Sequence, residues 1–271
     1  MTKVSGNIRK MQSKLDSPVD YKLPLFDVLE PNHLVPLNQL LGKQIAITFE
    51  NAINCVVTGK KIKKAYGEGM SYDAFMSSPL AVESIIRPEL SRIHEGIALR
   101  DLEWETQNHL QPHYTYLSNT SGLKVGVTRT TQIPTRWIDQ GATQALIIAE
   151  TPYRQAAGLI EVALKNHLAD KTNWQMMLKS NPVHIDLLGA KEKFAALIPD
   201  ELKQWIKPDT TETIIQYPIL RYPEKIKSLK LDTNPLIEGV LTGIKGQYLM
   251  INDQFVINIR SHTGYLISFE Y

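Results

Sequence analysis

A single cysteine, Cys55, sets the first limit on what this chain can fold into. One thiol cannot close an intramolecular disulfide, and it cannot supply the several thiolates that structural zinc sites use. The fold must therefore be held together by burial. With 271 residues, 43% of them hydrophobic and 21% charged, the chain has enough material for one large domain or a few small ones.

Hydropathy and charge narrow the class of protein. No apolar run approaches the roughly 20 residues that a membrane span needs, and residues 1–16 lack the apolar segment of a signal peptide. We therefore expect a soluble, cytoplasmic protein with no membrane partner. The net charge of +2 is far from the global positive field of a dedicated nucleic-acid binder, so any binding of that kind must be local.

The N-terminal part alternates between apolar and polar residues only in patches, such as residues 21–23 and 45–49, and it is rich in proline. This pattern predicts short strands and loops. A basic cluster follows: Lys60, Lys61, Lys63 and Lys64. It is either a solvated hairpin or a loop that pairs with phosphates while the neighbouring Tyr66 stacks on a base.

Residues 113–117 and 123–128 are rich in strand formers and are separated by a polar turn, which predicts a hairpin. Tyr114 and Tyr116 lie two positions apart and therefore point to the same side of the strand. Either tyrosine is also an ordinary strand residue. We interpret His113 as a residue at the strand edge and not as a base.

Two helices should follow the hairpin. Pro134 suits the first turn of a short helix that carries Arg136 and stops at Gly141. Arg136 is either a solvated surface charge or a two-pronged phosphate ligand.

The second helix spans about residues 153–168, with Thr151 as its cap. Glu161 falls at the margin of its apolar face, at about 100° per residue. A carboxylate there needs a cation, so it forms a salt bridge with Arg136 or Lys165, or it holds a single Mg²⁺.

The C-terminal part begins with surface helices at residues 190–198 and 200–206 and then becomes strand-like. The expected strands are residues 214–217, 236–240, 247–251 and 255–259, with turns at Gly246 and at residues 252–253. Short strands at this spacing predict a small barrel, with which the early strands around residues 21–49 would pair. A second basic run is either a solvated loop or a binding surface: Arg221, Lys225, Lys227 and Lys230.

Five residues of the middle region resemble, in order and spacing, the site of the GIY-YIG nuclease domain: Tyr116, Lys124, Arg136, Glu161 and Asn173. The resemblance implies that Tyr116 positions or deprotonates the attacking water, while Arg136 stabilises the charge at phosphorus. It also implies that Glu161 holds Mg²⁺ and that Asn173 fixes the cleft. A tyrosine with a pKa of about 10 is a poor base, so a nearby cation should lower the pKa of Tyr116. Lys124 replaces the family's second tyrosine, so a descendant that binds without cutting is a rival hypothesis.

Most of the chain also resembles a bacterial family of unknown function. The resemblance rests on residues 59–61, 87–90, 94–96, 111–113, 121–126 and 132–141. Members of that family carry several cysteines in a zinc-ribbon-like arrangement, and this chain has other residues near those places: Thr58, Ser71, Ala74, Ser84, Ser91 and Ala98. Cys55, His94 and His109 are too few to complete a zinc site. We therefore expect a degenerate zinc ribbon that binds no zinc.

We expect an α+β protein in four parts. A β-rich region with the degenerate ribbon covers residues 1–108, a GIY-YIG-like module residues 109–180, a helical connector residues 181–212, and a small β-barrel-like domain residues 213–271. The leading hypothesis is a nucleic-acid-binding protein, for DNA or RNA, that acts as a Mg²⁺-dependent endonuclease. The alternatives are a non-catalytic nucleic-acid or ribonucleoprotein adaptor and a structural interaction protein. Convergence of Tyr116, Arg136 and Glu161 would favour the enzyme, whereas their separation would favour the adaptor.

Overall fold

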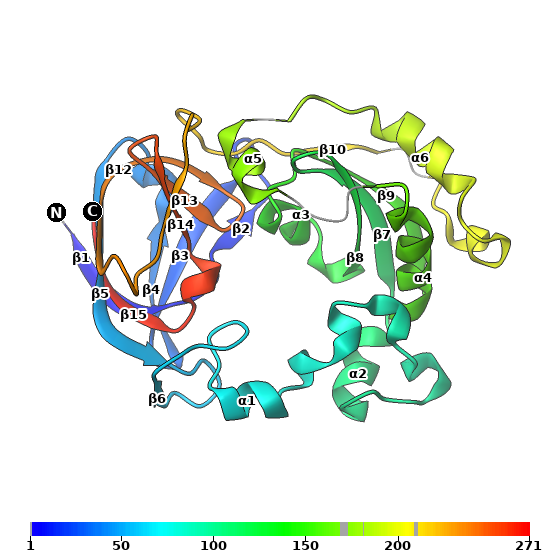
Figure 1. The fold of residues 1–271 in the computed structure, drawn as a ribbon, viewed down its shortest axis with the longest axis horizontal. Helices are drawn as coiled ribbons and strands as arrows, with labels where there is room; N and C mark the ends of the chain where they lie inside the picture. The colour runs from blue at the N-terminus through cyan, green and yellow to red at the C-terminus, as the bar shows by residue number, and fades with distance from the viewer. Residues whose placement is uncertain (1, 169–172, 181, 209–210) are drawn as a thin grey trace. The chain divides into compact units, whose positions relative to one another are not determined.

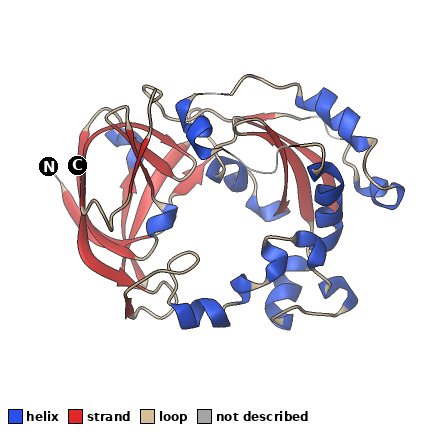
Figure 2. Cartoon of the chain, in the orientation of Figure 1, coloured by secondary structure: helices blue, strands red, loops and turns tan. Residues whose placement is uncertain are grey.

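The computed structural model describes residues 2–168, 173–180, 182–208 and 211–271 (Figure 1). The chain divides into two compact units. Unit 1 comprises residues 1–77, 178–180 and 216–271, and unit 2 comprises residues 78–177 and 181–215. Unit 1 is built mainly of strands, and unit 2 contains both strands and helices; Figure 2 draws strands in red and helices in blue. The predicted α+β class is therefore confirmed.

Unit 1 contains one eleven-stranded sheet. Nine strands follow one another in space in this order: β11 (Lys227–Leu229), β14 (Phe255–Asn258), β13 (Tyr248–Ile251), β12 (Leu236–Lys245), β5 (Gln44–Asn54), β15 (Tyr265–Glu270), β1 (Lys3–Ile8), β3 (Asp20–Asp27) and β2 (Gln12–Lys14). Two further strands pair at the side, β4 (Glu30–Pro36) with β3 and β6 (Lys61–Ile62) with β5. A short helix, α1 (Tyr72–Ser77), belongs to the same unit.

Strand β5 lies between two strands from the other end of the chain. Ile47 is paired with Ile237 of β12 on one side and with Phe269 of β15 on the other, and all three side chains are buried. An apolar face of this kind fixes the register, because a slip by one residue would turn these side chains to the opposite face. The predicted pairing of the early strands with the C-terminal strands is confirmed.

The expected small barrel is not present as a closed barrel. Strands β12, β13 and β14 form the predicted meander, and the predicted turns at Gly246 and at Asn252 and Asp253 adopt positive φ angles. In the described part of the chain the ladder runs from β11 to β2 without a pairing that closes it. A three-stranded meander has too few strands to close on itself, so β12 pairs its free edge with β5 instead.

Unit 2 contains a four-stranded sheet in the order β10 (Thr213–Ile214), β9 (Gln144–Thr151), β7 (His113–Asn119) and β8 (Leu123–Arg129). The strand expected at residues 214–217 is thus short and pairs with β9 of this sheet, which corrects its assignment to the C-terminal barrel. The α-helices of unit 2 are α2 (Leu102–His109), α3 (Thr135–Asp139), α4 (Arg154–Lys165) and α6 (Leu187–Ala195), whereas α5 (Trp174–Lys179) begins in unit 2 and ends in unit 1.

The core of unit 2 lies on one face of this sheet. Leu117 of β7 and Val125 of β8 pack there with Ile160 and Leu164 of α4. The apolar periodicity of residues 153–168 thus corresponds to the buried side of α4. The predicted cap is wrong, because the Thr151 hydroxyl donates to the carbonyls of His113 and Tyr153 and caps no helical N–H.

Candidate functional site

The middle of strand β7 carries Tyr116, which is paired directly with Gly126 of β8. A Cβ atom on Gly126 would lie 2.7 Å from both Cζ and Oη of Tyr116, which is closer than such atoms approach. The hydroxyl end of the phenol ring therefore lies against the glycine. The packing of the tyrosine ring requires glycine at position 126, whether or not Tyr116 takes part in a reaction.

Tyr116 is fully buried, and its hydroxyl donates to Oε1 of Gln140 over 3.1 Å. Trp137 of α3 meets the ring edge-on, with 5.9 Å between ring centroids. Burial raises the pKa of Tyr116, and the charge of Arg136 acts in the opposite direction without reversing it. The expected cation is present, but the expected net lowering of the pKa is wrong. Tyr116 is a neutral hydrogen-bond donor at physiological pH.

Helices α3 and α4 bring two opposite charges to this tyrosine. The charges of both Arg136 and Glu161 affect the pKa of Tyr116, the arginine lowering it and the carboxylate raising it. Coulomb interactions weaken with distance, so both charges lie within electrostatic reach of the buried phenol. Three residues from β7, α3 and α4 that the sequence singled out are thus neighbours in the structure.

Arg154, at the start of α4, adds a second cation. Its guanidinium donates to the carbonyls of Ser84 and Ile85 over 2.7 and 2.9 Å. Burial lowers its pKa to about 10, and the neighbouring carboxylate of Glu161 acts to raise it. Arg154 does not stand out in the sequence, because an arginine at the start of a helix is ordinarily a surface residue. Arg154 and Glu161 are seven residues apart, or two helical turns, and that spacing would have placed both on one side of α4.

A third arginine extends the cluster, and two buried histidines, His109 and His113, lie within reach of its charges. Arg129, at the end of β8, hydrogen-bonds Oδ1 of Asn108, and its charge also lowers the pKa of Arg154. His113 is fully buried, and its Nδ1 lies 2.7 Å from the carbonyl of Gln111. We call the set of Tyr116, Arg129, Arg136, Arg154 and Glu161 the arginine cluster.

The two histidines should make unit 2 sensitive to acid. Burial lowers the pKa of His109 to about 3 and that of His113 to about 4, from an ordinary value of 6.5. Between pH 6.5 and 5 the unfolded chain therefore binds more protons than the folded one. Stability should be complete above pH 6.5 and fall as the pH decreases, by up to about 1.4 kcal/mol per pH unit for each histidine.

Urea unfolding at several pH values tests this expectation. The variant with both His109→Gln and His113→Gln should lose the part of the slope between pH 6.5 and 5 that these two residues contribute and keep the part due to His262 of unit 1, whose pKa burial also lowers. His33→Gln, at an exposed site in unit 1, should retain the full slope. A double variant whose stability still declines as steeply as that of the parent would contradict the assignment.

The remaining predicted site residues lie in different surroundings. Lys124 of β8 is paired with Ser118 and is half-buried. Asn173 is exposed, and its Oδ1 accepts from the N–H groups of Gln175 and Met176, both over 3.1 Å, as a cap of α5. Its own N–H donates to the Ser121 hydroxyl over 2.9 Å. Asn173 thus attaches α5 to the β7–β8 turn.

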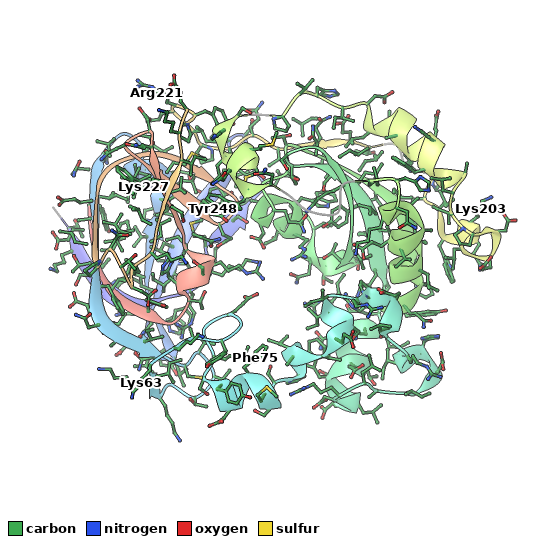
Figure 3. The ribbon with its side chains drawn as sticks, in the orientation of Figure 1. Lys63, Phe75, Lys203, Arg221, Lys227 and Tyr248 are labelled. Atoms are coloured by element: carbon green, nitrogen blue, oxygen red, sulfur yellow. The ribbon has the colours of Figure 1, made fainter. Side chains whose placement is uncertain are left out.

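The lysine hairpin, comprising Lys60, Lys61, Lys63 and Lys64, belongs to unit 1. All four side chains are exposed, Lys63 among them in Figure 3, and β6 pairs with the end of β5 to form the hairpin. The ammonium of Lys64 lies 5.3 Å from the ring centroid of Tyr66. The arrangement fits both a solvated hairpin and a phosphate-contacting loop.

The positions that the resemblance assigns to a degenerate ribbon are divided between the two units: Cys55, Thr58, Ser71 and Ala74 lie in unit 1, and Ser84, Ser91 and Ala98 lie in unit 2. The sulfur of the buried Cys55 accepts from the N–H of Ser71 over 3.2 Å, and the Ser71 hydroxyl accepts from the N–H of Ala74. Burial acts to raise the pKa of Cys55, but hydrogen bonds from Thr58, Ser71 and Val57 prevail and lower it to about 6. Throughout the described residues no group of three or more His, Cys, Asp or Glu side chains could hold a metal ion.

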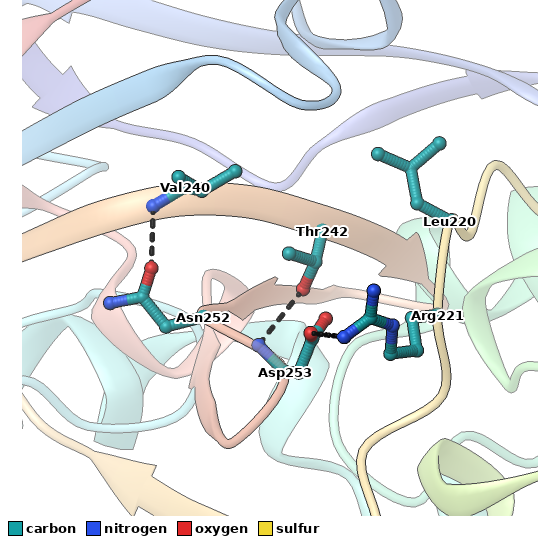
Figure 4. A pocket seen from close by; sticks show the side chains of 6 residues that line it. All are labelled: Leu220, Arg221, Val240, Thr242, Asn252 and Asp253. Carbon is teal, nitrogen blue, oxygen red and sulfur yellow. Dashed lines mark hydrogen bonds and ion pairs between the residues drawn. The ribbon is translucent and has the colours of Figure 1, made fainter.

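A cavity of about 380 Å³ lies within unit 1, beside the β13–β14 turn (Figure 4). Oδ1 of Asn252 accepts from the N–H of Val240 over 2.7 Å, and the N–H of Asp253 donates to the Thr242 hydroxyl over 3.3 Å. Arg221 pairs with Asp253 over 2.9 Å. These contacts hold the turn, and they engage one residue of the second basic run, Arg221, in a local ion pair.

No helix among the described residues is both long and apolar enough to cross a membrane.

Comparisons with known proteins identify a family but no function. Neither the search of curated proteins nor the search of solved structures found a match. The model of one family, described as "Protein of unknown function (DUF2797)", matches residues 42–267, and the chain therefore belongs to that family.

Proposed function

We propose that this protein binds nucleic acid, that the arginine cluster of unit 2 holds a phosphodiester, and that it cuts this bond with Mg²⁺ as an endonuclease. The observation that carries the proposal is the gathering of Tyr116, Arg136 and Glu161 from three separate elements. The order β7, β8, α3, β9 and α4 also supports a GIY-YIG-like module, because the residues that resemble its site occur on corresponding elements.

The charges of the cluster suit a phosphate. The three arginines outnumber the two carboxylates, Glu161 and Glu89, whose charges act on Arg154. Planar guanidinium groups match phosphate oxygens in two-pronged contacts. Arg136 would neutralise charge that develops at phosphorus, and such electrostatic stabilisation is usually the largest contribution to catalysis. Tyr116, as a neutral donor to Gln140, would orient α3 and its arginine relative to the strand.

The arginine cluster can hold a magnesium ion only when phosphate oxygens and water supply most of the ligands. Glu161 is the carboxylate of the cluster, and it is half-buried near Arg136 and Arg154. One protein carboxylate suffices for Mg²⁺ when phosphate oxygens and water complete the octahedron. Magnesium would neutralise charge on the phosphate and its leaving oxygen. We therefore expect Glu161 to bind magnesium together with nucleic acid and only weakly without it.

A non-catalytic adaptor is the second candidate, and one observation favours it. The hydroxyl of Tyr116 is buried, its pKa is raised, and Lys124 stands where the resemblance has a second tyrosine. A buried phenol with a raised pKa cannot take a proton from water at neutral pH. An adaptor would bind phosphates through the same arginines without turnover.

A cleavage and binding screen separates the two candidates. Branched, single-stranded and duplex DNA and RNA would be incubated with the full chain with and without Mg²⁺, beside Arg136→Gln. Arg136→Gln should weaken binding under either candidate, whereas magnesium-dependent product should appear only for the enzyme. If neither cleavage nor binding occurs with any of these nucleic acids, the proposal is refuted.

The lysine hairpin provides a separate prediction. Replacing Lys60, Lys61, Lys63 and Lys64 together with glutamine should weaken binding and flatten its dependence on salt. For duplex DNA each lost phosphate contact should reduce the slope of log K against log salt by about 0.9. The matched control is the second basic run, also exposed and in unit 1, replaced in the same way: Arg221, Lys225, Lys227 and Lys230. An unchanged slope in the hairpin variant would exclude the hairpin as a contact surface.

A further inference from the structure

Unit 2 contains a cavity of about 390 Å³ at the end of its sheet, and the roles predicted above do not use it. It lies where β7 begins and β9 ends, and its wall includes Glu150, Pro152, Gln204, Trp205 and Lys207. The segment that follows the 3-10 helix Asp200–Trp205 runs beside β9, since the N–H of Lys207 donates to the carbonyl of Ile148 over 2.8 Å. Backbone pairing thus fixes this wall to the sheet.

The wall is aromatic on one side. Trp205 meets Tyr153 edge-on, with 6.2 Å between ring centroids, and Tyr153 in turn stacks on His94 at 4.2 Å with parallel planes. Trp205 is only partly buried, so its indole packs against the core of unit 2 and still lines the cavity. An indole held in this way is a rigid, flat and apolar surface.

An ion pair between Lys207 and Glu150 lines the cavity. Nζ of Lys207 contacts Oε2 of Glu150 over 2.8 Å, and both side chains remain about one-third exposed, at 35% and 37%. Exposed ion pairs contribute little to stability, so the two groups can exchange partners at small cost. A carboxylate that accepts N–H groups and an ammonium that pairs with phosphate match the two ends of a nucleotide.

We propose that this cavity binds one unstacked nucleobase of single-stranded nucleic acid. Trp205 would stack on the base, Glu150 would accept a hydrogen bond from its N–H groups, and Lys207 would pair with the adjacent phosphate. The proposal deepens the proposed function, on which it rests, by naming a single-stranded partner and a base-binding position separate from the arginine cluster. Aromatic stacking of this kind tolerates different bases, because each has a flat face.

The test compares a short labelled oligodeoxycytidylate with an abasic strand of equal length, which has the same phosphates and no bases. Fluorescence anisotropy with the full chain should show tighter binding of the base-bearing strand, by about five- to a hundredfold for one base–aromatic stack. Trp205→Leu, which retains apolar packing, should lose this preference and keep the affinity for the abasic strand. Trp205→Phe should restore part of the preference.

Lys207→Met should weaken binding of both strands, and the matched control is Lys203→Met, which changes an exposed lysine of the preceding 3-10 helix that pairs with Asp200. A preference for bases that survives in Trp205→Leu would overturn the inference and leave the proposed function standing. A second probe covers the case in which neither strand binds. Cytidine monophosphate should then still quench the part of the tryptophan fluorescence that Trp205→Phe removes, and an absence of quenching would overturn the inference.

Discussion

Replacing Glu161 with glutamine is expected to abolish magnesium-dependent cleavage while the protein stays folded. Glutamine keeps the size of the side chain and the helix but removes the charge that would hold the metal. The rate should fall at least about a hundredfold, the effect of removing one preorganised electrostatic group. Nucleic-acid-dependent magnesium binding should disappear, and stability should change by about 1 kcal/mol or less. Melting temperature and turnover, measured on the same preparation, check this result.

The control is Glu192→Gln, which removes an exposed carboxylate from another helix of unit 2, α6. The contrary outcome is also specific. If Glu161 serves only as the counter-ion of the cluster arginines, its loss would leave Arg136 and Arg154 to repel each other and would destabilise the fold. A destabilised variant with normal activity per folded molecule would end the catalytic assignment.

Gly126→Ala is expected to destabilise unit 2 by about 1–3 kcal/mol, the usual effect of overpacking. The new methyl group would meet Cζ and Oη of Tyr116 at 2.7 Å, so the ring must leave its place and its hydrogen bond to Gln140. Trp137, whose ring meets the tyrosine edge-on, should report the displacement by fluorescence.

A double-mutant cycle identifies the cause of this loss. Tyr116→Leu combined with Gly126→Ala should be less destabilising than the sum of the two single changes, because the smaller side chain makes room for the methyl group. Strictly additive effects would show that Gly126 is needed for a reason other than the tyrosine ring.

Sequence patterns predicted the elements that depend on contacts between residues close together in the chain. The β7–β8 hairpin follows from two runs of strand formers around a polar turn, and α4 follows from apolar residues at helical spacing. The turn at Asn252 and Asp253 likewise follows from two residue types that tolerate positive φ. In each of these cases the determining contacts lie within a few residues.

The features that the sequence did not predict depend on distant partners. The barrel expected from β12, β13 and β14 stays open because β12 pairs with β5, which is distant in the sequence. The burial that raises the pKa of Tyr116 comes from the packing of α3 on the sheet, which no spacing rule contains. Arg129 and Arg154 were overlooked because an arginine at the end of a strand or the start of a helix is ordinarily a surface residue.

The position of β5 between β12 and β15 has a consequence for synthesis on the ribosome. When residues 44–54 have emerged from the ribosome, β6 follows within a few residues. The strands that cover both edges of β5, β12 and β15, follow only at residues 236–245 and 265–270. Unit 2 lies between β5 and β12 in the chain and can complete its own sheet before β12 is synthesised. Until β12 and β15 are made, most of both edges of β5 is unpaired. The side chains of Ile45 and Ile47, which are buried in the folded protein, are then exposed. Nascent-chain aggregation should therefore be governed by β5, and chaperones that cover hydrophobic strands would act on this segment while unit 2 is being made.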